Sequence, residues 1–432
     1  MREMKDSGIE WIGQIPTGWE LRRAKTLFMQ RNSKGNEIEV LLSPTQKYGV
    51  VPQSQLEGVV QVKEDTDLQM FKTVHKGDFV ISLRSFQGGF EYSLYEGVCS
   101  PAYQVFYPTS PICDTYYRYL FKSQSFISKM NNLTVGIREG KNIQYVDFAN
   151  SQIPVPPLAE QERIAAFLDA ECAEIDAVLE KTRASIEEYK KLKQAVITQA
   201  VTKGIRGDRP MKDSGIEWIG DIPAEWRKTQ LRHCAAIKSG ITLGKKYEKT
   251  DSLVERPYLR VANVQDGYVD LSVLTTIEVT QDEDLKYRLR AGDVLMTEGG
   301  DRDKLGRGCV WHGEIEPCLH QNHIFAVQTS KDTLLPEFLE YLTVSDVGRS
   351  YFDVTAIKTT NLACTSSSKV LAFTIPLPSV EEQAEIVEAL NTKCAGIDAL
   401  VAKKQQYLTE IENYKKSLIY EYVTGKKEAH PL

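Results

Sequence analysis

The sequence is poor in the residues on which metal and phosphate chemistry depend. Only six histidines occur in 432 residues, and His320 and His323 do not have the spacing of a known metal-ligand pair. The Gly-x-x-x-x-Gly-Lys-Ser/Thr phosphate-binding loop is missing. The Asn/Asp-Pro-Pro-aromatic tetrapeptides typical of adenine methyltransferases are missing too. We therefore expect no catalytic residue, no metal site and no cofactor bound by this chain.

Long hydrophobic runs and paired cysteines are missing as well. No apolar stretch reaches the length of a membrane-spanning helix, and the first residues have no apolar segment typical of a secretory signal. The eight cysteines are scattered, and none forms a Cys-x-x-Cys motif. We interpret them as reduced thiols and expect a cytoplasmic protein. The net charge of −6 argues against coating nucleic acid by bulk electrostatics, but it leaves sequence-specific binding open.

The most informative feature that is present is an exact repeat. The segment MKDSGIEWIG occurs at 4–13 and again, unchanged, at 211–220. We call each copy a tag. Both tags are followed by Ile-Pro and then by a tryptophan, Trp19 or Trp226. The chain is therefore two tandem half-proteins, whose near-identical parts can bind the same thing twice while the divergent parts bind different things.

A second repeat predicts two long helices. It begins at Ile153 and at Ile375 and runs without a gap at an offset of 222 (375 minus 153). Apolar residues spaced alternately by four and three form a seam over 168–200 and over 390–422, which is typical of a coiled coil. The same imperfections, Lys or Thr in the seam, recur in both copies, so we expect the helices to pair with each other in one chain. Two separate helices, each packed on its own globular domain, are the alternative.

The two variable blocks between these repeats predict a mixed α/β fold. Short runs of apolar, β-branched and aromatic residues are separated by turn residues. Gly77-Asp78 in the first block matches Gly292-Asp293 in the second, and a Gly-rich turn follows each. This pattern favours one fold that carries two different binding surfaces. The predicted strands are 79–83, 103–107, 258–261, 294–297 and 324–327.

The doubled arrangement resembles one protein family. A tag, Ile-Pro-x-x-Trp, a variable block and then Ile-Pro-x-Pro-x-x-x-Glu-Gln opening a heptad helix, each present twice, is similar to the specificity subunit of type I restriction–modification enzymes. The resemblance implies a mixed α/β fold with an internal two-fold repeat, in which two α/β target-recognition domains are separated by two long helices forming an antiparallel intramolecular coiled coil. The implied segments are 1–152 (first recognition domain with its tag), 153–210 (central helix and linker), 211–374 (second recognition domain with its tag) and 375–432 (C-terminal helix).

The resemblance also implies a function. Each recognition domain would read one half of a bipartite double-stranded DNA target, while the coiled coil would space the domains and dock two methyltransferase subunits. This chain would be non-catalytic. Its methyltransferase partners would use S-adenosylmethionine to methylate adenine N6, and a separate restriction subunit would use ATP and magnesium to translocate and cut unmodified DNA.

Two other functions stay open. One is a coiled-coil scaffold that docks two identical proteins without touching DNA. The other is a stand-alone nuclease with a cluster of Glu298, Asp301, Asp303 and Lys304, which is the weaker alternative because no strand spacing supports it.

Candidate DNA-binding residues are polar and basic side chains on two turns of each block. Arg, Lys, Asn and Gln read base edges, and Lys and Arg position phosphates. Each residue taken alone could equally be a solvated surface charge, but the equivalent placement in both blocks favours these turns. The predicted residues are Arg84, Ser85, Gln87, Arg138, Lys141 and Asn142 in the first block and Arg302, Lys304, Arg307, Lys358 and Asn361 in the second.

Candidate partner-binding residues lie in the repeated segments, because two copies of one partner need two like surfaces. For the tag, packing against the start of its own recognition domain is an equally weighted interpretation. The predicted residues are Glu160, Gln161, Glu382 and Gln383 at the two helix starts and Trp11 and Trp218 in the tags.

Overall fold

The computed structural model divides the chain into two compact units. The first is Met1–Arg183 with Gln406–Leu432, and the second is Ala184–Gln405. The side chains of Leu133 and Lys358 are not described. The structure describes residues 2–35, 40–56, 68–82, 89–133, 143–248, 252–300, 305–306, 308–358 and 363–430.

The first unit is built on a four-stranded antiparallel sheet in the order β4-β11-β8-β9. Aromatic residues dominate its core: Phe28 packs on Phe79 with ring centroids 5.8 Å apart, and Phe106 packs on Phe148 at 4.6 Å. Large aromatic side chains bury much apolar surface, and this stabilises the contact of the helices with the sheet. The elements are β4 Phe28–Arg31, β8 Phe79–Ile81, β9 Phe90–Tyr92, β11 Gln104–Pro108, α1 Asp114–Lys122, α2 Gln124–Leu133 and α3 Tyr145–Asn150.

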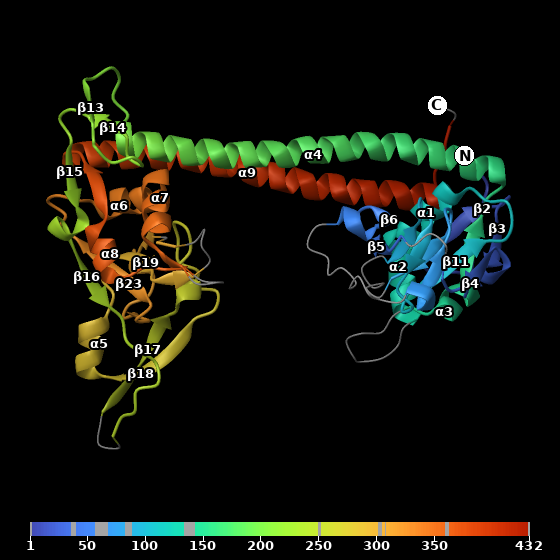
Figure 1. Ribbon diagram of the computed structural model, residues 1–432, viewed down its shortest axis with the longest axis horizontal. Coiled ribbons are helices and arrows are strands. Elements are labelled where there is room, and N and C mark those ends of the chain that lie inside the picture. The colour runs from blue at the N-terminus through green and yellow to red at the C-terminus, as the bar shows by residue number, and fades with distance from the viewer. Residues whose placement is uncertain are drawn as a thin grey trace. The chain divides into compact units, whose positions relative to one another are not determined.

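The second unit repeats this architecture. Its main sheet is also four-stranded and antiparallel, in the order β16-β23-β19-β21. Three helices follow the sheet along the chain, as α1 to α3 do in the first unit (Figure 1). The expectation of one fold used twice is therefore confirmed. The elements are β16 Ala235–Ser239, β19 Val294–Thr297, β21 Gly308–Val310, β23 Ile324–Thr329, α6 Pro336–Val344, α7 Asp346–Thr355 and α8 Ser367–Ala372.

All five predicted strands overlap observed strands. The prediction of 258–261 meets only the end of one of them, which runs over Leu253–Leu259. Its first half contains Glu255 and Arg256, whose charges break the apolar run that marked the other strands. Glu255 and Arg256 nevertheless belong to the strand, because they pair with Glu278 and Ile277 of the neighbouring strand. Composition alone does not predict this pairing.

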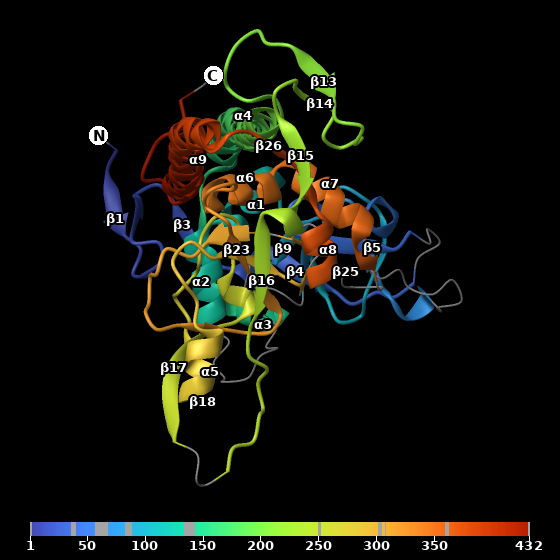
Figure 2. The same ribbon diagram turned by 90° about the vertical axis from the view of Figure 1, so that its left-hand side faces the viewer.

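The two units differ in what surrounds the main sheet. In the first, two extra strand pairs are added, β5 Leu42–Thr45 with β6 Gly49–Pro52 and β7 Lys72–Val74 with β10 Gly97–Cys99. In the second, the additions form a three-stranded sheet β18-β17-β22 and a small sheet β20-β25-β24. Figure 2 shows β17, β18 and α5 at the end of this unit away from α6. These additions are β17 Leu253–Leu259, β18 Thr275–Thr280, α5 Gln281–Tyr287, β20 Gly299–Gly300, β22 Leu319–His320, β24 Ile357–Lys358 and β25 Ala363–Cys364.

Each tag forms the same small hairpin. Its two strands pair in the same register in both units, and the turn ends at Gly13 or Gly220, with φ of 69° and 68°. The strand after each hairpin pairs with the strand that leads into a long helix, so the tag and the helix start come together although they are far apart in sequence. These elements are β1 Met4–Asp6, β2 Gln14–Pro16, β3 Glu20–Arg23 and β12 Gln152–Val155, and β13 Met211–Asp213, β14 Asp221–Pro223, β15 Arg227–Gln230 and β26 Thr374–Leu377.

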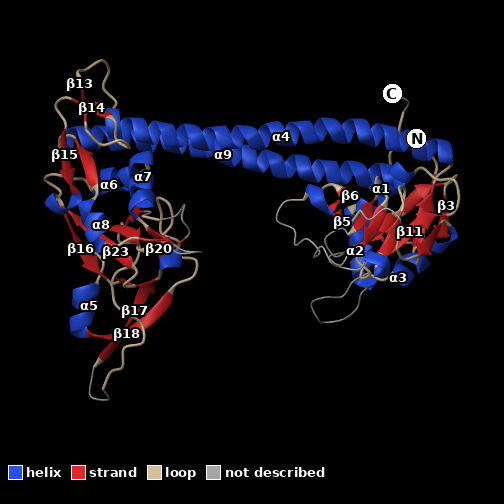
Figure 3. Cartoon of the chain, viewed as in Figure 1, coloured by secondary structure: helices blue, strands red, loops and turns tan. Residues whose placement is uncertain are grey.

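The two long helices pair within the chain. They are α4 Leu158–Lys203 and α9 Val380–Val423, drawn in blue in Figure 3. In the first unit Lys415 Nζ lies 2.6 Å from Asp176 Oδ1, and in the second Lys193 Nζ lies 2.7 Å from Asp398 Oδ2. Residue numbers fall along one helix as they rise along the other, so the pairing is antiparallel. The predicted intramolecular coiled coil is confirmed.

The helices are typical of surface coiled coils in composition. Seam residues such as Leu179 and Leu408 are buried, with 5% of their surface exposed, while Glu and Lys fill the outer positions. No helix within the described ranges is both long and apolar enough to cross a membrane.

Candidate functional site

A buried hydrogen bond joins the first tag to the start of α4. Trp19 has no exposed surface, and its Nε1–H donates to Glu160 Oε2 at 3.0 Å. The other carboxylate oxygen, Oε1, pairs with Arg2 Nη1 at 2.5 Å. The guanidinium carbon of Arg2 also lies 5.5 Å from the centre of the Trp19 ring. Each oxygen of this nearly buried carboxylate thus has a partner, the indole N–H for one and the Arg2 charge for the other, which offsets the cost of burying its charge.

The same arrangement occurs in the second unit. Trp226 Nε1–H donates to Glu382 Oε2 at 2.9 Å, and Arg209 Nη1 lies 2.6 Å from Glu382 Oε1. The Arg209 guanidinium is 5.1 Å from the Trp226 ring centre. We call this set the Arg–Trp–Glu clamp. It consists of Arg2, Trp19 and Glu160 in the first unit and Arg209, Trp226 and Glu382 in the second.

The glutamine after each clamp glutamate holds a different helix. Gln161 Oε1 accepts a hydrogen bond from the backbone N–H of Cys113, the N-cap of α1, at 2.9 Å. Gln383 Oε1 accepts one from Leu335, the N-cap of α6, at 2.8 Å. Each glutamine also donates to the backbone carbonyl of a proline just before its own helix. The Glu-Gln pair therefore fastens each long helix to the unit in which it begins.

Four of the predicted partner-binding residues are these Glu-Gln side chains. Their exposed fractions are 8% for Glu160, 2% for Gln161, 3% for Glu382 and 0% for Gln383. Their hydrogen-bonding groups are engaged inside their own unit, so they have a structural role. Docking of a partner at these helix starts stays a prediction.

The tag tryptophans are partly buried against their own units. The Trp11 ring lies edge-on to Phe126 of α2, with centroids 5.7 Å apart, and the Trp218 ring lies 6.1 Å from Tyr351 of α7. Each tag thus packs on a helix of its own unit. A partner contact at Trp11 and Trp218 stays a prediction as well.

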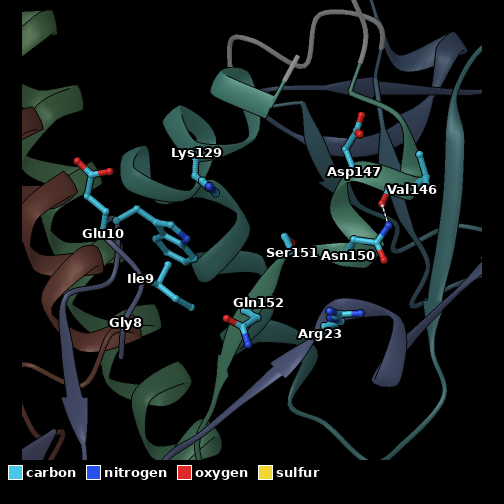
Figure 4. A pocket seen from close by; sticks show the side chains of 11 residues that line it. Gly8, Ile9, Glu10, Arg23, Lys129, Val146, Asp147, Asn150, Ser151 and Gln152 are labelled. Atoms are coloured by element: carbon cyan, nitrogen blue, oxygen red, sulfur yellow. Dashed lines mark hydrogen bonds between the residues drawn. The ribbon is translucent and has the colours of Figure 1, made fainter. Parts of the chain in front are cut away.

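Beside the first tag lies a cavity of about 580 Å³. Figure 4 shows Lys129 and Arg23 on different sides of it, with Asp147 of α3 nearby. Glu10 of the tag adds a second carboxylate to its lining. This mixture of charges favours no single class of ligand. In the second unit Tyr351, 222 residues beyond Lys129, fills the equivalent position against the tag.

The predicted DNA-binding residues lie outside what the structure describes. The first turn falls between the described residues Ser82 and Gly89, and its counterpart falls after Gly300. These turns follow β8 and β19, which hold the same place in the two main sheets. The assignments stay predictions. Outside the described residues are Arg84, Ser85, Gln87, Arg138, Lys141, Asn142, Arg302, Lys304, Arg307 and Asn361, and for Lys358 only the backbone is described.

The Gly-Asp landmarks before these strands are turns that position the sheet. Gly77 and Gly292 have φ of 96° and 95°, a conformation that favours glycine. Asp78 Oδ2 accepts a hydrogen bond from the His75 backbone at 2.8 Å, and Asp293 accepts the same bond from Arg290 at 3.0 Å. The landmarks therefore mark a shared fold rather than a shared binding site.

The residues of the nuclease alternative are only partly described. Glu298 Oε2 lies 2.5 Å from His323 Nδ1, while Asp301, Asp303 and Lys304 fall outside the described residues. Across the residues that are described, no group of three or more His, Cys, Asp or Glu could hold a metal ion.

Comparison with known protein families finds a match for the first half of this duplicated architecture. Residues 16–188 match the family model of the type I restriction modification DNA specificity domain. In this segment the chain is similar to the type I restriction–modification specificity subunits. The matched segment includes the first main sheet and the first half of α4, and the second unit has the same strand order. The function of a specificity subunit is recognition of a DNA target.

Curated specificity subunits from two organisms are similar to parts of the chain. It is 26% identical over 332 residues to the type I restriction enzyme EcoKI specificity subunit of Escherichia coli (strain K12), across 74% of this chain and 67% of that one. It is 25% identical over 208 residues to the putative type I restriction enzyme MjaX specificity subunit of Methanocaldococcus jannaschii, across 48% and 47% of the two chains. The chain thus spans about two thirds of one relative and about half of the other.

A solved structure shows the same fold. The chain has 18% identity and a TM-score of 0.70 to a chain in a structure titled as the basis of complex assembly and conformational transition of the type I R-M system, and the match covers 96% of this chain and 99% of that one. The predicted fold, two α/β domains with a paired-helix coiled coil, is thus confirmed.

Proposed function

We propose that this specificity subunit reads a bipartite double-stranded DNA target, one half with each unit, and that it is itself non-catalytic. One observation carries the proposal: the same sheet and clamp occur twice, but the elements added around them differ. A target with two unlike halves needs two unlike surfaces on one repeated scaffold. The strand pairs β5-β6 and β7-β10 in the first unit, against β17, β18 and α5 in the second, supply that difference.

The turns after β8 and β19 are the proposed base-reading loops. The strands that precede them, β8 and β19, hold equivalent places in the two main sheets. Arg84 and Arg302 lie on these turns, and arginine is the side chain that most often reads guanine, through two hydrogen bonds in the major groove. The loops differ in sequence, which is why we assign them to different half-sites.

Two methyltransferase subunits are the proposed protein partners. The repeated tags and paired helices give two like surfaces, as two copies of one partner require. In this proposal the partners supply S-adenosylmethionine-dependent methylation of adenine N6, and restriction subunits supply magnesium- and ATP-dependent cleavage in the cytoplasm. A scaffold that docks the two partners without DNA contact is the alternative.

Half-site binding by the assembled complex tests this proposal. The chain is purified with its methyltransferase subunits, and binding is measured on duplexes altered in one half at a time. Arg84→Ala should relax selectivity in one half and Arg302→Ala in the other, with stoichiometry unchanged. Lys181→Ala, an exposed substitution on α4, is the matched control. A complex that assembles but binds all duplexes alike would support the scaffold alternative.

The proposed lack of catalytic activity is tested on the isolated chain. With S-adenosylmethionine, or with ATP and magnesium, it should neither methylate nor cut DNA. Turnover by a pure sample would overturn this part of the proposal.

A further inference from the structure

The second unit has a groove that neither the fold nor the DNA-binding function explains. It has a volume of about 950 Å³ and lies between α6 and the adjacent parts of α4 and α9. Figure 1 shows α6 directly beside the two long helices. Apolar and polar residues of all three helices form its walls, among them Ile197, Tyr341 and Cys394. The loop at Gly267 lines it as well.

Glu340 of α6 places a poorly solvated carboxylate in this groove. Burial raises the pKa of Glu340 to about 7, and the nearby carboxylates of Glu337 and Asp266 add to the rise. The backbone of Val310 donates a hydrogen bond to it. Among the described residues it has no ion pair. An incoming cation would therefore gain a charge-assisted hydrogen bond and relieve the desolvation of the carboxylate.

Of the lysines and arginines that line the groove, Lys190, Lys193 and Arg349 have carboxylate partners of their own, and Lys191 is exposed to solvent. Lys193 pairs with Asp398 of α9, and Arg349 lies 3.6 Å from Asp266. They border the groove without neutralising Glu340. The groove therefore offers Glu340, a half-buried carboxylate that has no ion pair among the described residues, to a ligand that reaches past its rim.

The equivalent position in the first unit carries the opposite charge. The N-caps of α1 and α6, Cys113 and Leu335, are 222 residues apart (335 minus 113) and are held by the same glutamine bond. At that offset Arg118 of α1 matches Glu340 of α6. Arg118 is exposed, and its guanidinium lies 5.2 Å from the ring centre of Tyr92.

The cavity at this place in the first unit is also smaller and basic. Its volume is about 270 Å³, and Lys122 and Lys416 line it without any carboxylate among the lining residues. Lys122 pairs with Glu91 beneath it at 2.5 Å. At the 222 offset Lys122 matches Val344 of the larger groove. The repeated scaffold thus presents two grooves that differ in size and in charge.

We propose that the groove of the second unit is the docking site for a lysine- or arginine-bearing segment of a methyltransferase subunit, whose cation pairs with Glu340. The inference rests on the proposed function and deepens it. Charge complementarity identifies the occupant, because a half-buried carboxylate with no ion pair among the described residues attracts a cation. Arg118 stands at the place of this anchor in the first unit, so the two copies of the partner bind to unequal sites.

The test is a titration of the intact chain with the purified methyltransferase subunit. Copies bound are counted by native mass spectrometry, and the two dissociation constants are measured by calorimetry. We expect two unequal steps for the unaltered chain. Glu340→Gln keeps the side-chain shape and removes the charge, and it should weaken the tighter step by about tenfold or more, as loss of a charge-assisted hydrogen bond predicts. Arg118→Gln, at the equivalent position of the first unit, is the matched control and should leave the tighter binding step unchanged.

The outcomes separate the inference from the proposed function. An unaltered chain that binds no methyltransferase overturns both. A chain that binds two copies, with both constants unchanged by Glu340→Gln and by Glu340→Arg, overturns the inference alone. Unchanged thermal unfolding of the Gln variant excludes loss of fold as the cause of weaker binding. If Arg118→Gln weakened the tighter binding step as much as Glu340→Gln does, the inference would also be overturned. That result would show that the charge of Glu340 has no specific role.

Discussion

The Arg–Trp–Glu clamp makes a quantitative prediction about how each long helix is held. Glu160→Ala removes the acceptor of the Trp19 Nε1–H and the counter-ion of Arg2 in one step. Trp19 is fully buried, so its donor is left without a partner. Arg2 is 25% exposed at its side chain, so solvent recovers part of its loss.

The expected cost follows from these environments. Removing one member of a buried ion pair costs about 3–5 kcal/mol, and the partial exposure of Arg2 lowers this to roughly 2–4 kcal/mol. Trp19→Phe removes one donor and leaves Glu160 paired with Arg2, so about 1–3 kcal/mol is expected. Glu382→Ala should cost less than Glu160→Ala, because Arg209 keeps its second ion pair, with Glu225 at 3.0 Å.

Local hydrogen exchange is the suitable assay. A chain of two units need not unfold in one step, so a global free energy of unfolding is poorly defined. Amide exchange at the first turns of α4 and α9 reports the opening of each helix start separately. Glu162→Ala, an exposed neighbour in the same turn, is the control. If Glu160→Ala lowers protection there by less than about tenfold, or no more than the control does, the clamp does not hold the helix and the reasoning fails.

Three further predictions follow from the loops, the coiled coil and the groove. Arg84→Ala should weaken DNA binding by about 1–3 kcal/mol and relax one half-site only, measured with half-substituted duplexes; equal relaxation of both halves would contradict the assignment. Inserting four residues near Thr182 should lengthen one helix by about 6 Å and widen the gap in the target by roughly two base pairs; a changed half-site sequence would count against a spacer. The pKa of Glu340 in the folded state, about 7, lies above its ordinary value of 4.5, so the folded state binds more protons than the unfolded state between these pH values. The stability of the second unit should therefore fall as the pH rises from about 4.5 to 7. The buried His320, whose pKa is lowered to about 4, makes the stability rise with pH between about 4 and 6.5. The contribution of Glu340 is therefore isolated by comparing the unfolding curves of Glu340→Gln and the unaltered chain at each pH. Identical pH dependence of the two would refute the Glu340 effect.

The repeats were sufficient to predict the scaffold. Identical tags fold into identical hairpins, and the heptad seams form the paired helices, because both signals are local in sequence. The clamp was not predicted, because Trp19 and Glu160 are 141 residues apart. One signal could have revealed it: Arg2 and Arg209, just outside the tags, share the 207-residue spacing of the tags themselves.

The charge difference between the grooves was beyond sequence reasoning. Arg118 and Glu340 lie in blocks whose sequences do not align, and only the bonds to the N-caps of α1 and α6 fix their register. The predicted DNA-reading turns rest on turn chemistry and on their place after equivalent strands. The structure describes those strands, β8 and β19, but not the turns themselves.

Sequencing of methylated adenines tests the central claim most directly. Genomic DNA is compared from cells that express the methyltransferase subunits with and without this chain. The account predicts a new methylated motif, made of two short specified blocks separated by a gap of unspecified bases, only when the chain is present. A motif that appears without the chain, or one made of a single uninterrupted block, would contradict it.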